Sequence, residues 1–593
     1  MQDRPAIGYV VEVDGGNVSL NLLDQHRGQM AAHRSGVSEV TDVGGMLGVD
    51  GGHKLLVLRI SGLNFAEPKE VHRISYRQPK ITDEPLRHLT GNVIGWIELV
   101  GDGLRFRADN LVTPALGAEA FPLSEAEIHS ILGGTDPTGP ITLGTEFRTG
   151  NRVKVGLNTL LAQHVAVLGS SGQGKSCFTA AILQQIAHMP RARVVIFDIN
   201  GEYDRAFRKS EEAIRNEDLS CRLEGALYRH TAIGAPVDGS NSLRIPYYAL
   251  GRQGLHRMLL PSERTQRPAL SFAIDRLRNV EWHEAERGAS LLGEPVTLFD
   301  DCRPLGDAAA ALAAIEQLRA GATPEANEWP PMAAVAALVA ESHSLTQGRQ
   351  RPERNAFLYG NVSPLITRIH RLLDDEMLQA VLDVSGGPPF SGATPLSWEA
   401  EAEHLVKEVF GDSTTPWRVH VVNLRQVPQD LAPLVLGSLL ELYAHILFRR
   451  GQGNSPATLL VLEEAHHYLR PIAEQSDSIG SALAYERLAK EGRKFGLSLW
   501  VSTQRPTEVS STVLSQCGTW MAFRLTSDQD LRVISTACEW ANPQEVKRIA
   551  GLPRQHAVLL GGSVSLPTCV LAPTANPRTR SEDAFFDAWQ DQD

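Results

Sequence analysis

Residues 164–176 read HVAVLGSSGQGKS, and this stretch decides the fold class of the chain. The apolar run at 164–168 predicts a buried strand, and the pattern of residues 177–186 predicts a helix. The segment between them, 169–176, matches the pattern GxxxxGK[ST] in full. A chance glycine-rich turn can produce the same letters, but the strand before it and the helix after it favour a phosphate-binding loop.

The predicted loop provides each group that phosphate binding requires. Its three glycines allow the backbone to turn so that successive N–H groups converge on phosphate oxygens. The N-terminus of the following helix adds partial positive charge. Lys175 is expected to contact the β- and γ-phosphates, and the Ser176 hydroxyl is expected to ligate Mg²⁺. We therefore predict that the cofactors ATP and Mg²⁺ bind at Gly169, Ser170, Ser171, Gly172, Gln173, Gly174, Lys175 and Ser176.

A second predicted strand ends in two carboxylates. Residues 458–466 read TLLVLEEAH, so Glu463 and Glu464 follow the strand at the edge where ligands bind in open α/β sheets. Glu463 is predicted to hold Mg²⁺ through water, and Glu464 to polarise the water that attacks the γ-phosphate. An exposed helix start also favours acidic residues and is the alternative for this pair. The phosphate-binding loop makes the hydrolytic interpretation the stronger one.

Polar and basic residues flank the next predicted strand, 497–503. Gln504 closes that strand and is interpreted as a sensor of the γ-phosphate or the water, with an ordinary strand-end hydrogen bond as the alternative. The run 486–494 reads ERLAKEGRK, and cations are favourable at a helix C-terminus in any case. The sharper hypothesis is that Arg487 or Arg493 crosses a subunit interface and stabilises transition-state charge. The residues do not decide between the two arginines.

Two acidic residues follow the strand that comes after the loop's helix. Residues 194–203 read VVIFDINGEY, which puts Asp198 at the end of the strand and Glu202 in the turn beyond it. Both side chains can border the predicted nucleotide site. Capping of the turn explains both acids equally well, so this choice stays open.

Strand-like runs alternate with helical runs from residue 153 onward. Two of the strand-like runs, 165–168 and 460–462, are uninterrupted apolar stretches, as in strands buried on both faces of a parallel sheet. We therefore predict an α/β fold with a parallel central sheet. Residues 1–110 instead read as short strands, such as 7–13 and 18–22, which are typical of a small barrel or sandwich. The predicted domains are an N-terminal β-barrel at 1–135, an ATPase domain at 145–575 with a helical insertion at about 205–415, and a C-terminal tail at 576–593.

Composition limits the remaining possibilities. A chain of 593 residues exceeds what one core usually organises. The six cysteines are scattered, so a reduced, cytoplasmic environment fits best. No apolar run approaches the roughly 18 residues that cross a bilayer and no secretory signal is apparent, so we predict no membrane partner. The net charge of −12 is weak evidence against a nucleic-acid partner, because a ring can confine its basic groups to a central channel.

Several segments together resemble the HerA family of the HerA–FtsK superfamily. Besides 164–176, they are FDINGEYDRAF (197–207), LRIPYYAL (243–250), VLEEAHHYL (461–469), ERLAKEGRKFGLSLWVSTQRP (486–506) and LSQCGTWMAFRL (514–525). The β-rich N-terminus resembles the small barrel domain of that family. The resemblance covers most of the chain and is weakest across 251–415. Gln173 departs from the family, which commonly has a small residue there, and Lys490 stands where the family often has Arg, which weakens a finger role at that position.

The resemblance implies a RecA-like core in a homo-hexameric ring that hydrolyses ATP to move double-stranded DNA through its centre. It also implies a partner effector, a nuclease or an NAD-consuming enzyme, that docks on the N-terminal barrel in DNA end processing or anti-phage defence. The alternative is a ring that binds ATP to assemble and regulate a partner enzyme, with little translocation. The acidic net charge and the lack of an obvious DNA-reading motif keep that alternative open. The lack of predicted membrane spans argues against a conjugation- or FtsK-type DNA pump.

Overall fold

The computed structural model describes most of the chain in two compact units. It describes residues 6–580 apart from 24–29, 34–35, 40–43, 66–86, 101–102, 109–111, 133–138, 148, 208–226, 237–239, 284–287, 297–306, 322–325, 430, 471–483 and 539–542. Contacts group the chain into Met1–Leu160 with Val558–Leu571, and Leu161–Ala557 with Ala572–Asp593. We describe each unit by itself. Cys221, Cys302 and most of the predicted C-terminal tail lie outside the described residues.

The first unit contains a closed six-stranded antiparallel barrel. Its strands follow in the order β2-β1-β9-β5-β6-β7, and β2 also pairs with β7, which closes the ring. Strand β8 (Gly103–Arg107) extends the sheet beyond β7, and β3 (Met30–His33) pairs with β4 (Gly36–Glu39) in a separate hairpin. The barrel strands are β1 (Gly8–Asp14), β2 (Asn17–Leu22), β5 (Met46–Asp50), β6 (Leu55–Phe65), β7 (Arg87–Val100) and β9 (Glu119–Pro122). The predicted barrel is confirmed.

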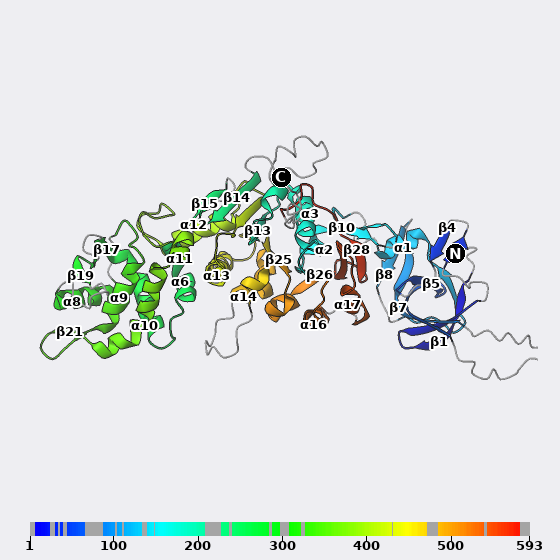
Figure 1. The fold of residues 1–593 in the computed structure, drawn as a ribbon, viewed down its shortest axis with the longest axis horizontal. Helices are drawn as coiled ribbons and strands as arrows, with labels where there is room; N and C mark the ends of the chain where they lie inside the picture. The colour runs from blue at the N-terminus through cyan, green and yellow to red at the C-terminus, as the bar shows by residue number, and fades with distance from the viewer. Residues whose placement is uncertain are drawn as a thin grey trace, which may run out of the picture. The chain divides into compact units, whose positions relative to one another are not determined.

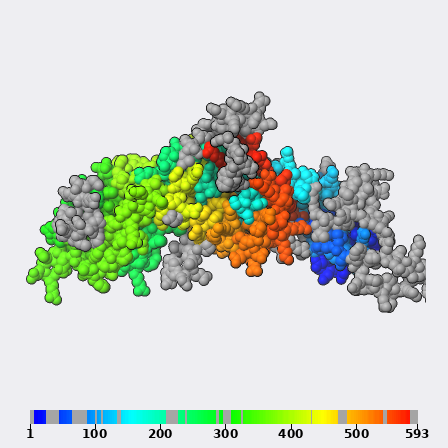
Figure 2. Space-filling model, viewed as in Figure 1, coloured from blue at the N-terminus to red at the C-terminus, as the bar shows by residue number. Residues whose placement is uncertain are grey.

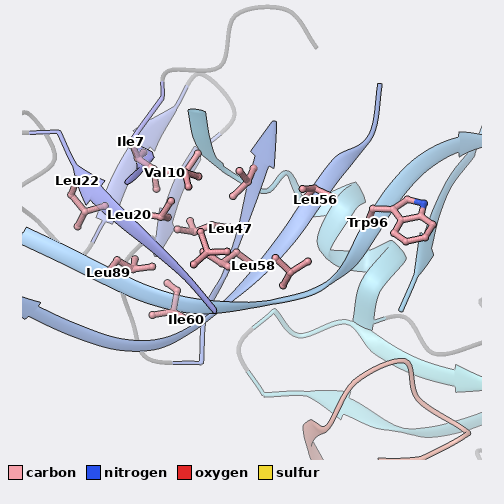
Figure 3. Close-up of a cluster of buried hydrophobic side chains, with 14 residues drawn as sticks. Ile7, Val10, Leu20, Leu22, Leu47, Leu56, Leu58, Ile60, Leu89 and Trp96 are labelled. Carbon is pink, nitrogen blue, oxygen red and sulfur yellow. The ribbon is translucent and has the colours of Figure 1, made fainter. Parts of the chain in front are cut away.

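Alternation of side chains along the strands fills the barrel. Successive residues of a strand point to opposite faces, so every second residue of β2 is buried, namely Val18, Leu20 and Leu22. Strands β1 and β6 send Val10, Leu56 and others into the same cluster. Figure 3 shows these side chains gathered between the strands. The hairpin predicted from residues 7–13 and 18–22 is therefore the start of the barrel.

The first unit also includes strands from both ends of the chain. Strand β10 (Ile141–Glu146) pairs with β11 (Arg152–Val155) and with β28 (Thr568–Leu571), next to which lies β27 (His556–Gly561). Leu566 packs with Leu123 and Ile131 in a core shared with helix α1 (Glu125–Leu132). Because of these contacts, residues 141–160 and 558–571 group with the barrel, whereas the predicted domain limits assign most of them to the ATPase domain.

The second unit is built on a parallel sheet, which confirms the predicted fold class. Its eight described strands lie in the order β26-β12-β25-β24-β13-β23-β14-β15, and each strand pairs in parallel with its neighbours in this order. Five of them are buried along their whole length, as uninterrupted apolar runs require. The strands are β12 (His164–Leu168), β13 (Val194–Asp198), β14 (Tyr228–Ile233), β15 (Asn241–Leu243), β23 (Val419–Asn423), β24 (Thr458–Leu462), β25 (Leu497–Thr503) and β26 (Cys517–Phe523).

Strand order determines which loops meet. Strand β12 lies between β25 and β26, and β24 lies between β25 and β13. Since all these strands are parallel, the residues that follow β12, β25, β24 and β13 gather at one edge of the sheet. Helices α2 (Leu157–Leu161), α3 (Lys175–Ala187), α4 (Asp204–Phe207), α14 (Ala484–Glu491), α15 (Ser511–Ser515), α16 (Asp528–Ala537) and α17 (Pro543–Ile549) follow or connect the strands.

The predicted insertion, about 205–415, contains both sheet strands and helices. Strands β14 and β15 belong to the central sheet, and the helices begin beyond them. Figure 1 shows α8, α9 and α10 close together in this region, and Figure 2 shows its surface as one continuous green body. The helices are α6 (Gly251–Leu259), α7 (Gln266–Arg276), α8 (Ala308–Arg319), α9 (Ala333–Ser344), α10 (Ala356–Leu373), α11 (Glu376–Val381) and α12 (Trp398–Phe410). Three small sheets lie among them. Strand β16 (Ile245–Pro246) pairs with β22 (Leu382–Asp383), β18 (Gly288–Leu291) lies between β17 (Val280–His283) and β19 (Glu294–Val296), and β20 (Leu345–Gln347) pairs with β21 (Pro352–Arg354).

Among the described helices, one is long and apolar enough to cross a membrane by length and composition. It is α13 (Ala432–Arg450), whose 18-residue window has a mean hydropathy of 1.3 although Glu441 interrupts the apolar run. Two thirds of that window is buried, and the helix packs against α6, α12 and α14. This degree of burial is typical of a helix in the core of a protein.

Candidate active site

The loop after β12 has the backbone geometry that a phosphate site needs. Gly172 and Gly174 have φ of 70° and 104°, and Gly174 precedes the first residue of α3 with no side-chain cap. A Cβ on Gly169 would lie 2.5 Å from Cβ of Phe523, so only glycine fits there. The Gly169 and Ser170 N–H groups donate to the carbonyls of Thr503 and Arg524, which fix the loop to the ends of β25 and β26. The N–H groups at the start of α3 are left to face an anion.

Lys175 lies over the loop. Its Nζ donates to the carbonyl of Gly169 at 2.7 Å and to that of Ser170 at 3.1 Å, and the side chain is buried. Burial lowers the pKa of Lys175, and the charges of Glu464, Glu463 and Glu202 oppose that change. Three carboxylates close to one ammonium group favour its charged form, which phosphate binding requires.

Glu463 is buried at the end of β24 beside two tyrosines. The Tyr203 hydroxyl donates to Oε1 of Glu463, and the Tyr468 hydroxyl donates to its backbone carbonyl at 3.0 Å. Burial raises the pKa of Glu463 to about 7, against the hydrogen bond from Tyr203 and the charge of Lys175. The charge of Glu464 adds to the rise. A cation close to Glu463 would stabilise its ionised form.

Glu464 has a backbone that residues other than glycine rarely adopt. Its φ of 45° and ψ of 47° are left-handed, a conformation that costs about 1–2 kcal/mol. Its Oε1 accepts a hydrogen bond from Nε2 of Gln504, and Oε2 lies 3.3 Å from Nδ1 of His466. Nδ1 of His466 is also 3.1 Å from the Thr503 hydroxyl. The strained turn therefore aims the carboxylate at the end of β25, where the predicted sensor lies.

The choice left open for Asp198 and Glu202 resolves differently for each residue. The Asp198 carboxylate accepts the backbone N–H groups of Gly201, Glu202 and Tyr203 at 2.9–3.1 Å, so Asp198 caps the turn. Nδ2 of Asn200 donates to Oε1 of Glu202 at 3.3 Å. Burial raises the pKa of Glu202, and hydrogen bonding with the Ser176 and Asn200 side chains lowers it. Glu202 thus lies near the residue predicted to ligate the metal.

Tyr203 is a residue of the site that was not predicted from the sequence. Its ring is buried and its hydroxyl ends on Glu463, 260 positions further along the chain. The available signal was its place immediately after Glu202 in the turn that follows β13. In a sequence, a tyrosine in a turn gives no sign of a functional role until the partner of its hydroxyl is known.

The two candidate arginines lie away from the loop of their own chain. Arg493 donates to the carbonyl of Ala162 at 3.2 Å, just before β12 begins, whereas the loop follows the other end of that strand. A strand of five residues spans about 16 Å. The Arg487 guanidinium lies 4.1 Å from the ring centroid of Phe448 and pairs with Glu491. Both side chains are exposed and neither contacts the site described above.

A buried histidine holds the segment that carries these arginines. Nε2 of His164 donates to the carbonyl of Ala489 in α14 at 2.8 Å, and its Nδ1 accepts the N–H of Leu499 in β25 at 3.0 Å. The second contact fixes the proton on Nε2. Burial lowers the pKa of His164 to about 4, so it stays neutral. The C-terminal end of α14 is therefore tied to the strands beneath it.

The oxygen groups present fit Mg²⁺. Mg²⁺ takes oxygen ligands, commonly one or two carboxylates with substrate phosphates and waters. Ser176, Glu463 and Glu202 supply a hydroxyl and two carboxylates around Lys175, with Glu464 adding charge. Within the described ranges, no three His, Cys, Asp or Glu side chains form a group that could hold a metal ion by themselves.

The fold and these groups together define a P-loop ATPase. A family model described as the central domain of the helicase HerA matches residues 141–301. Over those residues the chain is similar to the HerA family.

Named relatives show how far the similarity extends. A probable DNA double-strand break repair helicase HerA of Methanocaldococcus jannaschii is 37% identical over 19% of this chain and 22% of that protein. The DNA double-strand break repair helicase HerA of Pyrococcus furiosus is 24% identical over 72% of this chain and 69% of that protein. The VirB4 structure of Thermoanaerobacter pseudethanolicus aligns at 16% identity over 74% of this chain and 98% of that chain, with a TM-score of 0.42.

Proposed function

We propose that this protein is an ATP-driven translocase or helicase that moves double-stranded DNA through a homo-hexameric ring. The observation that carries this proposal is the position of the two predicted arginines. Lys175, Glu464 and Gln504 converge at the loop, while Arg493 lies at the far end of β12 and Arg487 beside Phe448. In a ring, a neighbouring subunit can bring one of these arginines to the loop. Similar proteins are named as DNA double-strand break repair helicases, which supports DNA as the proposed substrate.

The proposed chemistry assigns one role to each group. The loop N–H groups and Lys175 hold the β- and γ-phosphates, and Glu464 orients and deprotonates the attacking water. Gln504 fixes Glu464 through its hydrogen bond and registers whether the γ-phosphate is present. Bound Mg²⁺, held by Ser176 and by Glu463 through water, would neutralise charge on the phosphate oxygens. Glu463 and Glu464 thereby serve the metal and the nucleophile separately.

A subunit-mixing experiment tests whether an arginine acts across the interface. We expect Arg493→Ala or Arg487→Ala to lower turnover by about 1000-fold, the usual worth of an arginine finger. Mixed with a Glu464→Gln chain at a 1:1 ratio, that variant should regain activity at about a quarter of the interfaces, where an intact site meets an intact arginine. The measurement is ATP turnover at several mixing ratios. Absence of rescue at every ratio for both variants would remove the arginine from the proposal.

Duplex DNA separates the motor from the ring scaffold. In the translocase, ATP turnover should rise several-fold with duplex DNA at low salt, and the rise should fall as salt screens the phosphate contacts. A scaffold that only assembles a partner enzyme predicts unchanged turnover. Single-stranded DNA of equal length is the control. Unchanged turnover, together with normal partner activity supported by a Lys175→Ala chain, would contradict the motor.

We also propose that a partner effector, a nuclease or an NAD-consuming enzyme, docks on the barrel in DNA end processing or anti-phage defence. Leu99 and Leu104 support this docking site, because they face each other across the β7–β8 pairing with exposed fractions of 72% and 39%. A cytoplasmic location fits the four described cysteines, which form no disulfide among the described residues. Co-purification of the full chain from its own cells identifies the partner, and a Leu99→Asp chain that retains it would exclude this surface.

A further inference from the structure

The two oxygens of the Glu464 carboxylate differ in their partners. Oε1 accepts the hydrogen bond from Nε2 of Gln504. Oε2 is buried and accepts no hydrogen bond of good geometry from any residue that the structure describes, although Nδ1 of His466 lies 3.3 Å from it. A buried oxygen that lacks a donor is unfavourable. What the His466 ring presents at Nδ1 therefore decides whether the proposed base is fixed at one oxygen or at both.

The His466 ring has a defined place between the ends of β24 and β25. It is buried, and its Nδ1 lies 3.1 Å from the hydroxyl of Thr503, the last residue of β25. The N–H of His467 donates to the carbonyl of Glu464 at 2.9 Å, and Nε of Arg470 donates to the carbonyl of His466 at 3.2 Å. These contacts keep Nδ1 facing two oxygens, the Glu464 carboxylate and the Thr503 hydroxyl.

The position of one proton decides what Nδ1 does there. Burial lowers the pKa of His466, against the charge of Glu464, so at neutral pH the ring carries a single N–H. With that proton on Nε2, the Nδ1 lone pair would face an ionised carboxylate, whereas a proton on Nδ1 is donated toward it. The Thr503 hydroxyl fits either case, because it can donate or accept besides accepting the N–H of Arg505 at 3.1 Å. The carboxylate thus selects the tautomer with the proton on Nδ1.

We propose that His466 is a positioning residue for the base: its Nδ1–H is directed at Oε2 of Glu464 and, with Gln504 at Oε1, fixes the plane of the carboxylate. This inference rests on the proposed function, since it concerns the same nucleotide site. Each carboxylate oxygen has two lone pairs, so a held oxygen can still accept a proton from water. The carbonyl of Thr503 also accepts the N–H of Gly169 at 3.3 Å, so one strand end places both the ring and the phosphate-binding loop.

Amide side chains that reach different positions of the ring provide the test. The amide nitrogen of Asn can occupy about the place of Nδ1, and that of Gln about the place of Nε2. In the full-length chain, we expect His466→Leu and His466→Gln to lower kcat for ATP at least about tenfold with KM little changed, because a misplaced base slows the chemical step. His466→Asn should recover most of that loss. His188→Asn, at the exposed end of α3, is the control and should match the unaltered chain.

Combination with Glu464→Gln shows whether His466 acts through the base. If it does, His466→Leu should not slow the residual hydrolysis of a Glu464→Gln chain further, because the group that it positions is already lost. A further tenfold loss there, equal turnover of His466→Asn and His466→Gln, or an unchanged kcat in His466→Leu would overturn the inference. Should His466→Leu melt at a lower temperature than the unaltered chain, the comparison of Asn with Gln carries the test. An unaltered chain that hydrolyses no ATP would instead contradict the proposed function.

Discussion

A Glu464→Gln chain is expected to bind ATP normally and to hydrolyse it at least about 100-fold more slowly, because the amide cannot accept a proton from water. The substitution keeps the shape of the side chain, and its Oε1 can still accept the hydrogen bond from Gln504. The left-handed backbone at this position is also unchanged, so the effect should fall on the chemical step. Single-turnover hydrolysis and separate ATP-binding titrations measure the two quantities.

Glu263→Gln is a suitable control for that variant. Glu263 is exposed, belongs to the helical region and pairs with Arg267, so its loss should leave turnover unchanged. Hydrolysis retained by Glu464→Gln would reassign the base, and Glu463 or Glu202 would then be the next carboxylates to replace. Loss of ATP binding in the variant would mean that Glu464 holds the nucleotide or the loop and not the water.

A Lys175→Ala chain is expected to lose nucleotide affinity by at least about tenfold, because hydrogen bonds to a charged group contribute about 1.5–3 kcal/mol each. Without nucleotide, Lys175 donates to two loop carbonyls and balances three glutamates. The variant leaves those glutamates without a cation, which further disfavours triphosphate in the same place. Titration with a non-hydrolysable ATP analogue measures the affinity.

Lys407→Ala provides the matched control, since Lys407 is an exposed lysine on α12 that pairs with Asp412. Its nucleotide affinity should equal that of the unaltered chain. Unchanged binding by Lys175→Ala would remove the phosphate assignment from the loop. The assignment of Lys175 is the one on which the interpretation of the whole site depends.

Much of the fold could be predicted because local pattern determines it. The run 164–168 predicts the limits of β12, and the alternation at 18–22 predicts the inward face of β2. Strands buried on both faces, such as β12 and β24, are mostly apolar along their length, so their sequences are distinctive. Strands β14 and β15 are harder to predict from the sequence. Strand β14 carries Arg229 and His230 among its six residues, so its sequence looks polar.

The site was predicted in part for a related reason. The loop, Glu463, Glu464 and Gln504 each follow a recognisable strand, and parallel strands bring their carboxyl ends together. In the structure, Gln504 donates a hydrogen bond to Glu464. Lys175 lies close to the charges of Glu464, Glu463 and Glu202. It does not bring Arg487 or Arg493 to the same place, so the role of either stays a prediction that depends on a second subunit.

The sequence by itself predicted which residues would carry the chemistry, since strand, loop and helix signals are local and need no knowledge of neighbours. Only the tertiary structure decided how those residues share the work. Because β24 lies beside β13, the turn after β13 comes close to the end of β24, which puts the Tyr203 hydroxyl on Glu463. That pair joins residues that lie 260 positions apart, and nothing in either local pattern specifies the partner. The loop quoted first predicts that phosphate binds, and the packing of the sheet decides which carboxylate receives the Tyr203 hydroxyl.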